Sequence, residues 1–173
     1  QVDRARDIVK ALLEFSRQSD FSIRRHSFRK LVETTLMLIK GDIPSNIDLD
    51  IQMDDEVYGF FDFNRMQQVL LNLIINSTHA MIAGGRLTIE GFEEKGSGMF
   101  IFKVADTGAG IPSENLNRIF DPFFTTKEVG KGSGLGLSII HGIIEKHKGR
   151  IKVDSRVNTG TTFSIFLPLQ PEV

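Results

Sequence analysis

The chain has no cysteine, almost no net charge and no long apolar run, and each absence excludes a class of protein. Without cysteine, its 173 residues form no disulfide framework, no thiolate zinc site and no cysteine nucleophile, which suits a reducing compartment. Lys and Arg total 21 against 22 Asp and Glu, so no global field attracts nucleic acid or an anionic membrane. No apolar run approaches the roughly 18 residues of a membrane-spanning helix, and no leader pattern opens the chain. Because the chain begins at Gln1, we expect a cytoplasmic piece of a longer protein that contacts neither membrane nor nucleic acid.

Residues 1–18 have the apolar spacing of an amphipathic helix. The apolar side chains recur at i, i+3, i+4, i+7 and i+8, and are Ala5, Ile8, Val9, Leu12 and Leu13. One stripe without a partner of similar length cannot bury itself, so we interpret it as half of a helical hairpin or dimer bundle. Residues 1–30 hold eight Lys and Arg against four acids. A solvated helix face explains this excess better than a response-regulator or nucleic-acid surface, because no set of stacking aromatics accompanies it.

Farther along, mixed periodicities predict an α+β domain. Helical spacing covers residues 27–39, 62–82 and 135–147, with Asp62 as a suitable N-cap for the second helix. Since strands and helices do not alternate regularly, we expect a mainly antiparallel sheet with helices on one face. Residues 106–133 show little periodicity, and loops of that length are usually functional or disordered. Strand patterns, the first with the alternation of a half-exposed strand, cover residues 47–53, 86–90, 99–104, 150–153 and 161–167.

The predicted helix 62–82 carries a narrow polar stripe. Within about 80° of arc, at 100° per residue, lie Arg65, Gln68, Asn72, Asn76 and His79. A solvent face is the ordinary explanation of such a stripe. Amide oxygens, however, are neutral hard ligands suited to Mg²⁺ that receives most of its charge balance from phosphates. Asn72 and Asn76, one turn apart, are therefore a candidate metal and phosphate site.

Asp106 follows an apolar strand and begins the run Asp106-Thr107-Gly108-Ala109-Gly110-Ile111. A carboxylate there can accept a hydrogen bond from an exocyclic amine such as adenine N6, and the glycines let a planar ligand approach the backbone. Guanine presents an acceptor in that place and would leave two like groups facing each other. A type I turn with Asp at its first position explains the same residues without a ligand. In isolation, the turn is the simpler interpretation.

Alternating glycines lead into the predicted helix 135–147, in the run Gly130-Lys131-Gly132-Ser133-Gly134-Leu135-Gly136. Free N–H groups and the positive start of a helix suit a phosphate chain. Further donors would come from Lys127, Lys131 and Ser133. A flexible linker is the alternative, but linkers rarely lead directly into an apolar helix. Because exposed phenylalanine is costly, we expect three residues between the glycine runs to anchor the loop against the core, namely Phe120, Phe123 and Phe124.

Taken in order, four motifs resemble the N, G1, F and G2 boxes of the sensor histidine kinase catalytic domain. They are Asn72-x3-Asn76, Asp106-x-Gly108-x-Gly110, Phe120-x2-Phe123-Phe124 and Gly132-x-Gly134-x-Gly136. The run Asn158-Thr159-Gly160-Thr161-Thr162-Phe163 is similar to the last glycine box of that family. The resemblance covers residues 25–170, and the first helix is similar to the second helix of the hairpin that dimerises these kinases and carries the phosphoacceptor. It divides the chain into residues 1–22, the end of that hairpin, and residues 23–173, the ATP-binding domain.

The resemblance implies a Bergerat-type two-layer sandwich that binds ATP and Mg²⁺, preceded by one N-terminal helix. Asp106 would hold adenine with support from Thr161, Asn76 would coordinate the metal, and Asn72 and Lys127 would act at the triphosphate. The other implied nucleotide contacts are His79, Gly108, Gly110, Ile111, Phe120, Gly130, Lys131, Gly132, Ser133, Gly134, Leu135 and Gly136. Three positions depart from the family pattern, namely Asn158 where glycine is common, Ser133 where threonine is common, and His79 where many members carry a basic residue.

The implied activity is transfer of the γ-phosphoryl group of ATP to a histidine in two-component signalling. Its implied partners are the phosphoacceptor helix of the same protein, a cognate response regulator and, in the full-length protein, a second subunit. No histidine of this chain precedes an acid as the acceptor box requires, so we expect the acceptor helix to be missing.

Two alternatives to the kinase keep the same fold. The related gyrase, chaperone and mismatch-repair ATPases hydrolyse ATP with a Glu four residues before the magnesium Asn, a position that Asn72 occupies here. An amide cannot accept a proton at neutral pH, so we expect no rapid hydrolysis. A non-catalytic nucleotide-binding or dimer-forming module is the other alternative.

Overall fold

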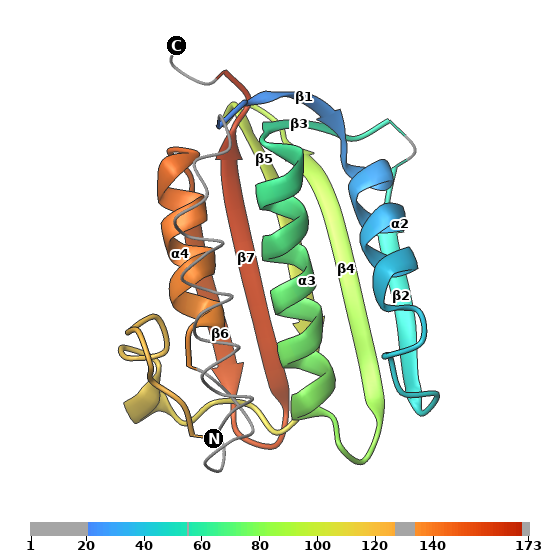
Figure 1. The fold of residues 1–173 in the computed structure, drawn as a ribbon, viewed down its shortest axis with the longest axis vertical. Helices are drawn as coiled ribbons and strands as arrows, with labels where there is room; N and C mark the ends of the chain where they lie inside the picture. Colours follow the sequence, from blue (N-terminus) through green and yellow to red (C-terminus); the bar gives the residue numbers. More distant parts are fainter. Residues whose placement is uncertain (1–20, 55, 127–133, 171–173) are drawn as a thin grey trace, which may run out of the picture.

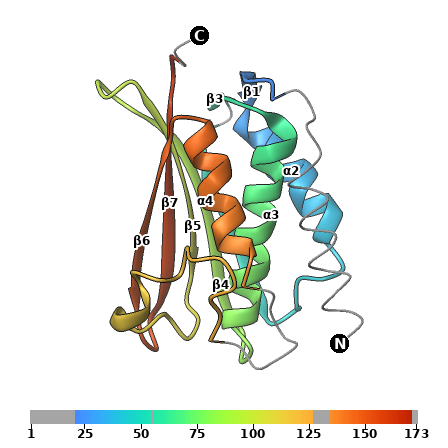
Figure 2. The same cartoon turned by 60° about the vertical axis from the view of Figure 1, so that its left-hand side comes forward.

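The computed structural model describes residues 21–54, 56–126 and 134–170, which form two layers. Three helices of this part of the chain cover one face of a five-stranded sheet, and the other face of the sheet carries no helix (Figures 1 and 2). The predicted α+β class, with helices on one face, is therefore confirmed. The predicted helix at residues 1–18 lies outside the described residues. No helix in the described ranges is long and apolar enough to cross a membrane.

The main sheet is mostly antiparallel, as predicted. Its strands follow the order β2-β4-β5-β7-β6, and only the β2–β4 pair is parallel. A parallel pair needs a crossover connection, and here the chain between β2 and β4 passes through a third strand and the longest helix. The strands are β2 (Ile47–Met53), β4 (Gly85–Glu94), β5 (Met99–Asp106), β6 (Arg150–Arg156) and β7 (Gly160–Pro168).

The helix layer consists of α2 (Phe28–Ile39), α3 (Phe63–Ala80) and α4 (Gly136–Lys146). Asp62 caps α3 as predicted, because its Oδ1 accepts a hydrogen bond from the Arg65 N–H at 3.0 Å. Ser27 caps α2 in the same way through the Lys30 N–H at 3.3 Å. Each predicted helix of the domain is present with boundaries close to those expected.

Phenylalanine side chains fill the middle of the core. Phe100 and Phe102 are fully buried on β5, and the ring of Phe28 from α2 lies 5.2 Å from each of them. Side chains of a strand alternate between faces, so Asp106 points from the end of β5 into the same helix-facing layer as these rings. The fold therefore places this carboxylate at one end of the hydrophobic core.

Two strands were not predicted. β1 (Arg24–Ser27) and β3 (Tyr58–Phe61) pair antiparallel as a separate two-stranded sheet. With four residues each, these strands are too short for alternation to stand out from the surrounding sequence. β2 lies at the edge of the main sheet and is partly exposed, as predicted. Of its alternating apolar residues, Ile47 is buried, whereas Leu49 and Ile51 are 40% and 41% exposed.

A buried histidine joins the end of α4 to the start of α3. His147 is 1% exposed, and its Nε2 accepts a hydrogen bond from the Asp62 N–H at 3.0 Å. Its Nδ1 lies 2.8 Å from the Ile143 carbonyl oxygen and must donate to it, because a carbonyl only accepts. Burial lowers the pKa of His147, although the Ile143 carbonyl and the Asp62 carboxylate oppose this effect. The neutral ring is thus built into the fold.

We expect the free energy of unfolding to decrease as the pH falls below about 6.5. The unfolded chain binds a proton at the ordinary histidine pKa, whereas folded His147 binds it only at lower pH, so acid favours unfolding. His26, whose pKa is also lowered mainly by burial, adds to the same trend. Urea unfolding at pH 8 and pH 5.5 should show a smaller loss of stability for His147→Phe than for the unsubstituted chain. Equal losses would contradict the assignment.

Candidate nucleotide-binding site

Hydrogen bonds hold the Asp106 carboxylate at the end of β5. Its Oδ1 accepts a hydrogen bond from the Gly108 N–H at 2.9 Å, and its Oδ2 accepts one from the Ser77 hydroxyl at 3.1 Å. Asp106 is only 8% exposed, and this burial raises the pKa of its carboxyl group. Hydrogen bonds from Gly108, Ser77 and the Thr161 backbone oppose the rise. The carboxylate is therefore oriented, and acceptor capacity remains for one ligand donor.

The loop after Asp106 is clamped between two other elements. The Ala109 N–H donates to the Ala80 carbonyl at the end of α3 at 3.0 Å, and a Cβ at Gly108 would lie 2.6 Å from that same oxygen. On the other side, the Ala109 carbonyl accepts from the Asn158 N–H at 2.8 Å. Gly110 has a φ of +71°, and a Cβ there would overlap the Arg156 carbonyl. Both glycines of the predicted adenine loop are thus required by close backbone packing.

Thr161 and Ile111, both predicted site residues, are connected by Ser155. Thr161 lies opposite Asp106 in the β5–β7 register, and its Oγ1 is 2.8 Å from the Ser155 Oγ. The Ser155 Oγ also accepts a hydrogen bond from the Ile111 N–H at 2.8 Å. One serine therefore ties the end of the adenine loop to the strand that supports Asp106.

One member of the predicted amide pair on α3, Asn76, faces the beginning of α4. Asn72 and Asn76 are half-buried, whereas His79 is exposed at the end of the helix. The Asn76 Nδ2 lies 4.0 Å from the position of a Cβ at Gly136, the first residue of α4. Because Ser77 bonds to Asp106, adjacent residues of α3 contact the two halves of the predicted site.

A backbone hydrogen bond joins Phe123 to Gly134, a residue of the glycine-rich run 130–136. The Phe123 N–H donates to the Gly134 carbonyl at 3.0 Å, and both residues have positive φ angles, +67° and +68°. Leu135 follows as the N-cap residue of α4 and offers no capping side chain. Five predicted contacts lie outside the described residues, namely Lys127, Gly130, Lys131, Gly132 and Ser133.

The expected anchoring of the phenylalanine cluster is wrong for one of its three members. Phe120 and Phe124 are half-buried and pack against the core, and the Phe120 ring lies 5.4 Å from the His141 ring. Phe123 is 59% exposed, and its backbone is left-handed and bonds to Gly134. The core anchoring of Phe120 and Phe124 is thus confirmed, and the nucleotide contact of Phe120 stays a prediction.

Two serines of the site were not predicted. Ser77 is 1% exposed and bonds to Asp106, and Ser155 bonds to Thr161 and Ile111. A serine on the otherwise apolar face of the predicted helix is the one signal that could have indicated Ser77. The position of Ser155 in a strand with alternating polar residues gave no comparable signal.

We expect Ser77→Ala to weaken ATP binding about tenfold, because a hydrogen bond to a charged group contributes roughly 1.5 kcal/mol to orienting that group. Thr78→Ala is the matched control, since the Thr78 hydroxyl bonds to the Ile75 carbonyl of its own helix instead. Calorimetric titration of both variants with ATP measures the effect. Equal affinities for the two variants would exclude a role for Ser77 in the site.

The residues present suit ATP and a metal ion chemically. The Asp106 carboxylate is an acceptor for an amine. A Cβ placed on Gly136 would have only the Asn76 amide nitrogen within 4.0 Å among the described residues outside its own stretch of chain, so there is open space beside Gly136. The Asn76 amide oxygen is a hard ligand, and the start of α4 carries the partial positive charge that favours phosphate. Ser77, next to Asn76 on α3, links the two parts of the site through its hydrogen bond to Asp106.

Comparison with known proteins identifies the family. Residues 61–171 match the family described as "Histidine kinase-, DNA gyrase B-, and HSP90-like ATPase". Sensor kinase CckA of Brucella abortus (strain 2308) is 37% identical over 180 residues, which cover 96% of this chain and 19% of that protein. The catalytic domain of histidine kinase ThkA, in a nucleotide-free form, superimposes with a TM-score of 0.77 at 32% identity, covering 87% of this chain and 97% of that one. ThkA in complex with response regulator protein TrrA gives a TM-score of 0.81 at 30% identity, over 98% of this chain and 48% of that one.

The chain covers only part of its curated relatives but nearly all of an isolated catalytic domain. It spans between 19% and 36% of the length of curated relatives such as CckA, AtoS and ZraS, whereas it spans nearly all of the isolated ThkA catalytic domain. The family match includes both the helix that carries Asn76 and the loop that follows Asp106. The chain belongs to the histidine kinase-, DNA gyrase B- and HSP90-like ATPases, and it has the ATP-binding fold of a sensor histidine kinase catalytic domain.

Proposed function

We propose that this chain binds Mg-ATP and transfers the γ-phosphoryl group to a histidine on a helix of the same protein that precedes it. The observation that carries the proposal is the hydrogen bond of Ser77 on α3 to Asp106, with the neighbouring Asn76 on α3 facing Gly136 at the start of α4. The Asp106 carboxylate is an acceptor for a purine amine, and Asn76, the neighbour of the serine that binds this carboxylate, offers an amide oxygen for a metal on the phosphate tail. The match to histidine kinase catalytic domains supports the same activity.

In this proposal each side chain has one task. Asp106 accepts a hydrogen bond from adenine N6, and Gly108 and Gly110 allow the base to lie against the backbone. Asn76 holds Mg²⁺, which when bound neutralises charge on the phosphates. Asn72 lies beside the triphosphate. The glycine-rich segment, with Lys127, Lys131 and Ser133, supplies further donors during transfer, which depends mainly on positioning and electrostatic stabilisation.

We further propose residues 1–22 as the end of the dimerisation hairpin and residues 23–173 as the catalytic domain, located in the cytoplasm. A response regulator is the proposed next partner, since ThkA has been solved with TrrA. The full-length protein is proposed to be a homodimer through that hairpin. Hydrolysis is disfavoured by Asn72, whose amide cannot act as a general base.

Incubation with γ-labelled ATP and a separate dimerisation hairpin that carries the acceptor histidine tests the activity. Acid-labile label on the hairpin is expected. Release of inorganic phosphate without labelling would indicate an ATPase, and binding without either product would indicate a nucleotide-binding module.

We expect Asn76→Ala to reduce phosphoryl transfer about a hundredfold while leaving recognition of the base nearly intact. The amide oxygen contributes to metal binding, and loss of one electrostatic contact at a transferring group typically costs about 3 kcal/mol. Asn64→Ala, at an exposed position of the same helix, is the control. Transfer rates at saturating Mg-ATP, together with the affinity for adenosine, separate the two effects. Equal losses of both would contradict a metal role for Asn76.

A further inference from the structure

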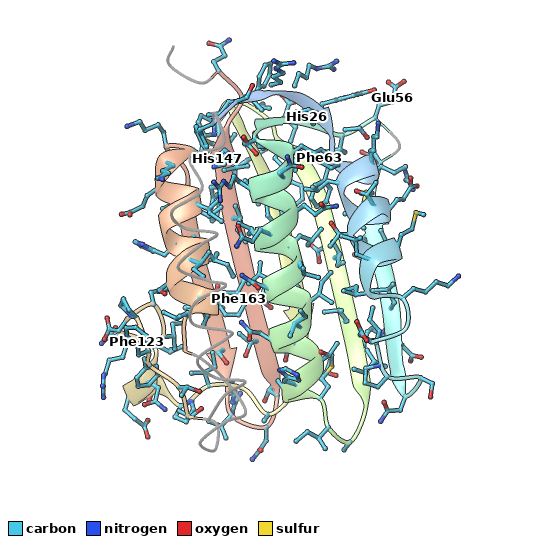
Figure 3. The ribbon with its side chains drawn as sticks, viewed as in Figure 1. His26, Glu56, Phe63, Phe123, His147 and Phe163 are labelled. Carbon is cyan, nitrogen blue, oxygen red and sulfur yellow. The ribbon has the colours of Figure 1, made fainter. Side chains whose placement is uncertain are left out.

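The chain enters the domain at Phe21 and Ser22, where it contacts the start of α3 and the end of α4. The Ser22 N–H donates to the Asp62 Oδ2 at 2.9 Å. The ring of Phe21 meets the ring of His147 edge-on, with centroids 4.7 Å apart. Asp62 and His147 are buried, at 8% and 1% exposure, so Phe21 and Ser22 contact residues of the domain interior. Figure 3 shows His147 at the same end of the molecule as Phe63, the first residue of α3.

Asp62 and His147 connect three segments at this point. The two oxygens of Asp62 have different partners, since Oδ1 caps α3 and Oδ2 binds Ser22. The N–H of Asp62 donates to His147, which in turn bonds to the Ile143 carbonyl in the last turns of α4. We call these four residues, Phe21, Ser22, Asp62 and His147, the entry joint. The entering chain therefore contacts the residue before α3 and the residue after α4.

The opposite ends of the same two helices form the proposed nucleotide site. Asn76 lies fourteen residues after Asp62, about 21 Å along α3 at 1.5 Å per residue. There, Asn76 faces Gly136 at the first turn of α4. α3 and α4 are packed side by side between these points (Figure 1). Because helices are rigid over this length, a change in their relative angle at the entry joint displaces Asn76 relative to the start of α4.

We propose that Asp62 and His147 are positioning residues through which the segment preceding the domain controls nucleotide binding. Docking of Ser22 on Asp62 fixes the start of α3 against the end of α4, and this sets the distance between Asn76 and Gly136. The inference rests on the proposed function, because it concerns regulation of the same site. Linkage requires the effect to be reciprocal, so nucleotide binding strengthens the docking of Ser22.

Ser22→Pro removes the N–H that docks on Asp62 and leaves every residue of the site in place. Ser22→Ala is the matched control, because it keeps that N–H. We expect titration with a non-hydrolysable Mg-ATP analogue to show about fivefold weaker binding for Ser22→Pro, with Ser22→Ala equal to the unsubstituted chain. In the unsubstituted chain, hydrogen exchange at the Ser22 amide should slow severalfold when the analogue is added.

The outcomes separate this inference from the proposed function. If the unsubstituted chain does not bind the analogue, the proposed function fails and this inference fails with it. If it binds, but Ser22→Pro binds equally well and Ser22 exchange does not change, only the entry joint is refuted. A merely structural contact would leave Ser22 exchange independent of nucleotide. Should Ser22→Pro not fold, Phe21→Ala replaces it, since Phe21 is 40% exposed and contacts His147 from outside the domain.

Discussion

Replacing Asp106 with asparagine is expected to lower the affinity for ATP about a hundredfold. The carboxylate offers acceptors on both oxygens, with Gly108 on one and Ser77 on the other. In asparagine one oxygen becomes an NH₂ group, which directs a donor at a donor whichever way the amide is turned. Loss of a charge-assisted hydrogen bond together with an unsatisfied buried donor costs about 3 kcal/mol, which corresponds to the stated factor.

Calorimetric titration of Asp106→Asn with Mg-ATP measures this effect. Asp154→Asn serves as the control, because Asp154 is exposed on β6. The control variant should bind as the unsubstituted chain does. Thermal unfolding of Asp106→Asn is needed alongside, since a folded variant with unchanged affinity would refute the adenine assignment and, with it, the proposed orientation of the nucleotide.

Gly110→Ala is expected to destabilise the domain by about 3 kcal/mol. A side chain at a φ of +71° costs roughly 1–2 kcal/mol, and the added Cβ would also overlap the Arg156 carbonyl, so the β6–β7 turn has to move. That turn also holds the Asn158 N–H that bonds to Ala109. The variant should therefore lose ATP affinity as well as stability.

Gly142→Ala provides a control of the opposite sign. Gly142 lies inside α4, and a Cβ there meets no atom of the described residues within 4 Å. Alanine in a helix interior is more favourable than glycine by about 0.5–1 kcal/mol, so this variant should be more stable than the parent. Urea unfolding of both variants measures the difference. A neutral Gly110→Ala would show that the adenine loop is not fixed by its packing against β6 and β7.

Local signals predicted most of the fold, because they report on local physics. Asp62 was predicted to cap α3, and its side chain does so, since capping depends only on residues within one turn. The apolar spacing of α3 likewise predicted which face is buried. The parallel pairing of β2 with β4, and the small β1–β3 sheet, depend on partners distant in sequence, and no short-range pattern encodes them.

The candidate site was predictable only in part for the same reason. Asp106 alone was better explained as a turn residue, and Asn76 as part of a solvent-facing stripe. The order of the motifs, and their resemblance to one family, indicated that the two residues act together. Ser77 and Ser155 escaped prediction because their importance lies in the partners to which the tertiary fold brings them.

The backbone bond between Phe123 and Gly134 has a consequence for how the domain tolerates change. It joins two residues that are eleven positions apart in the sequence, so the points at which the chain leaves and rejoins this part of the domain are fixed. Loop-closure entropy grows only logarithmically, at about 0.6 kcal/mol for each doubling. An insertion between Phe123 and Gly134 should therefore cost the domain little stability, whatever it does to the nucleotide contacts proposed for this part of the chain.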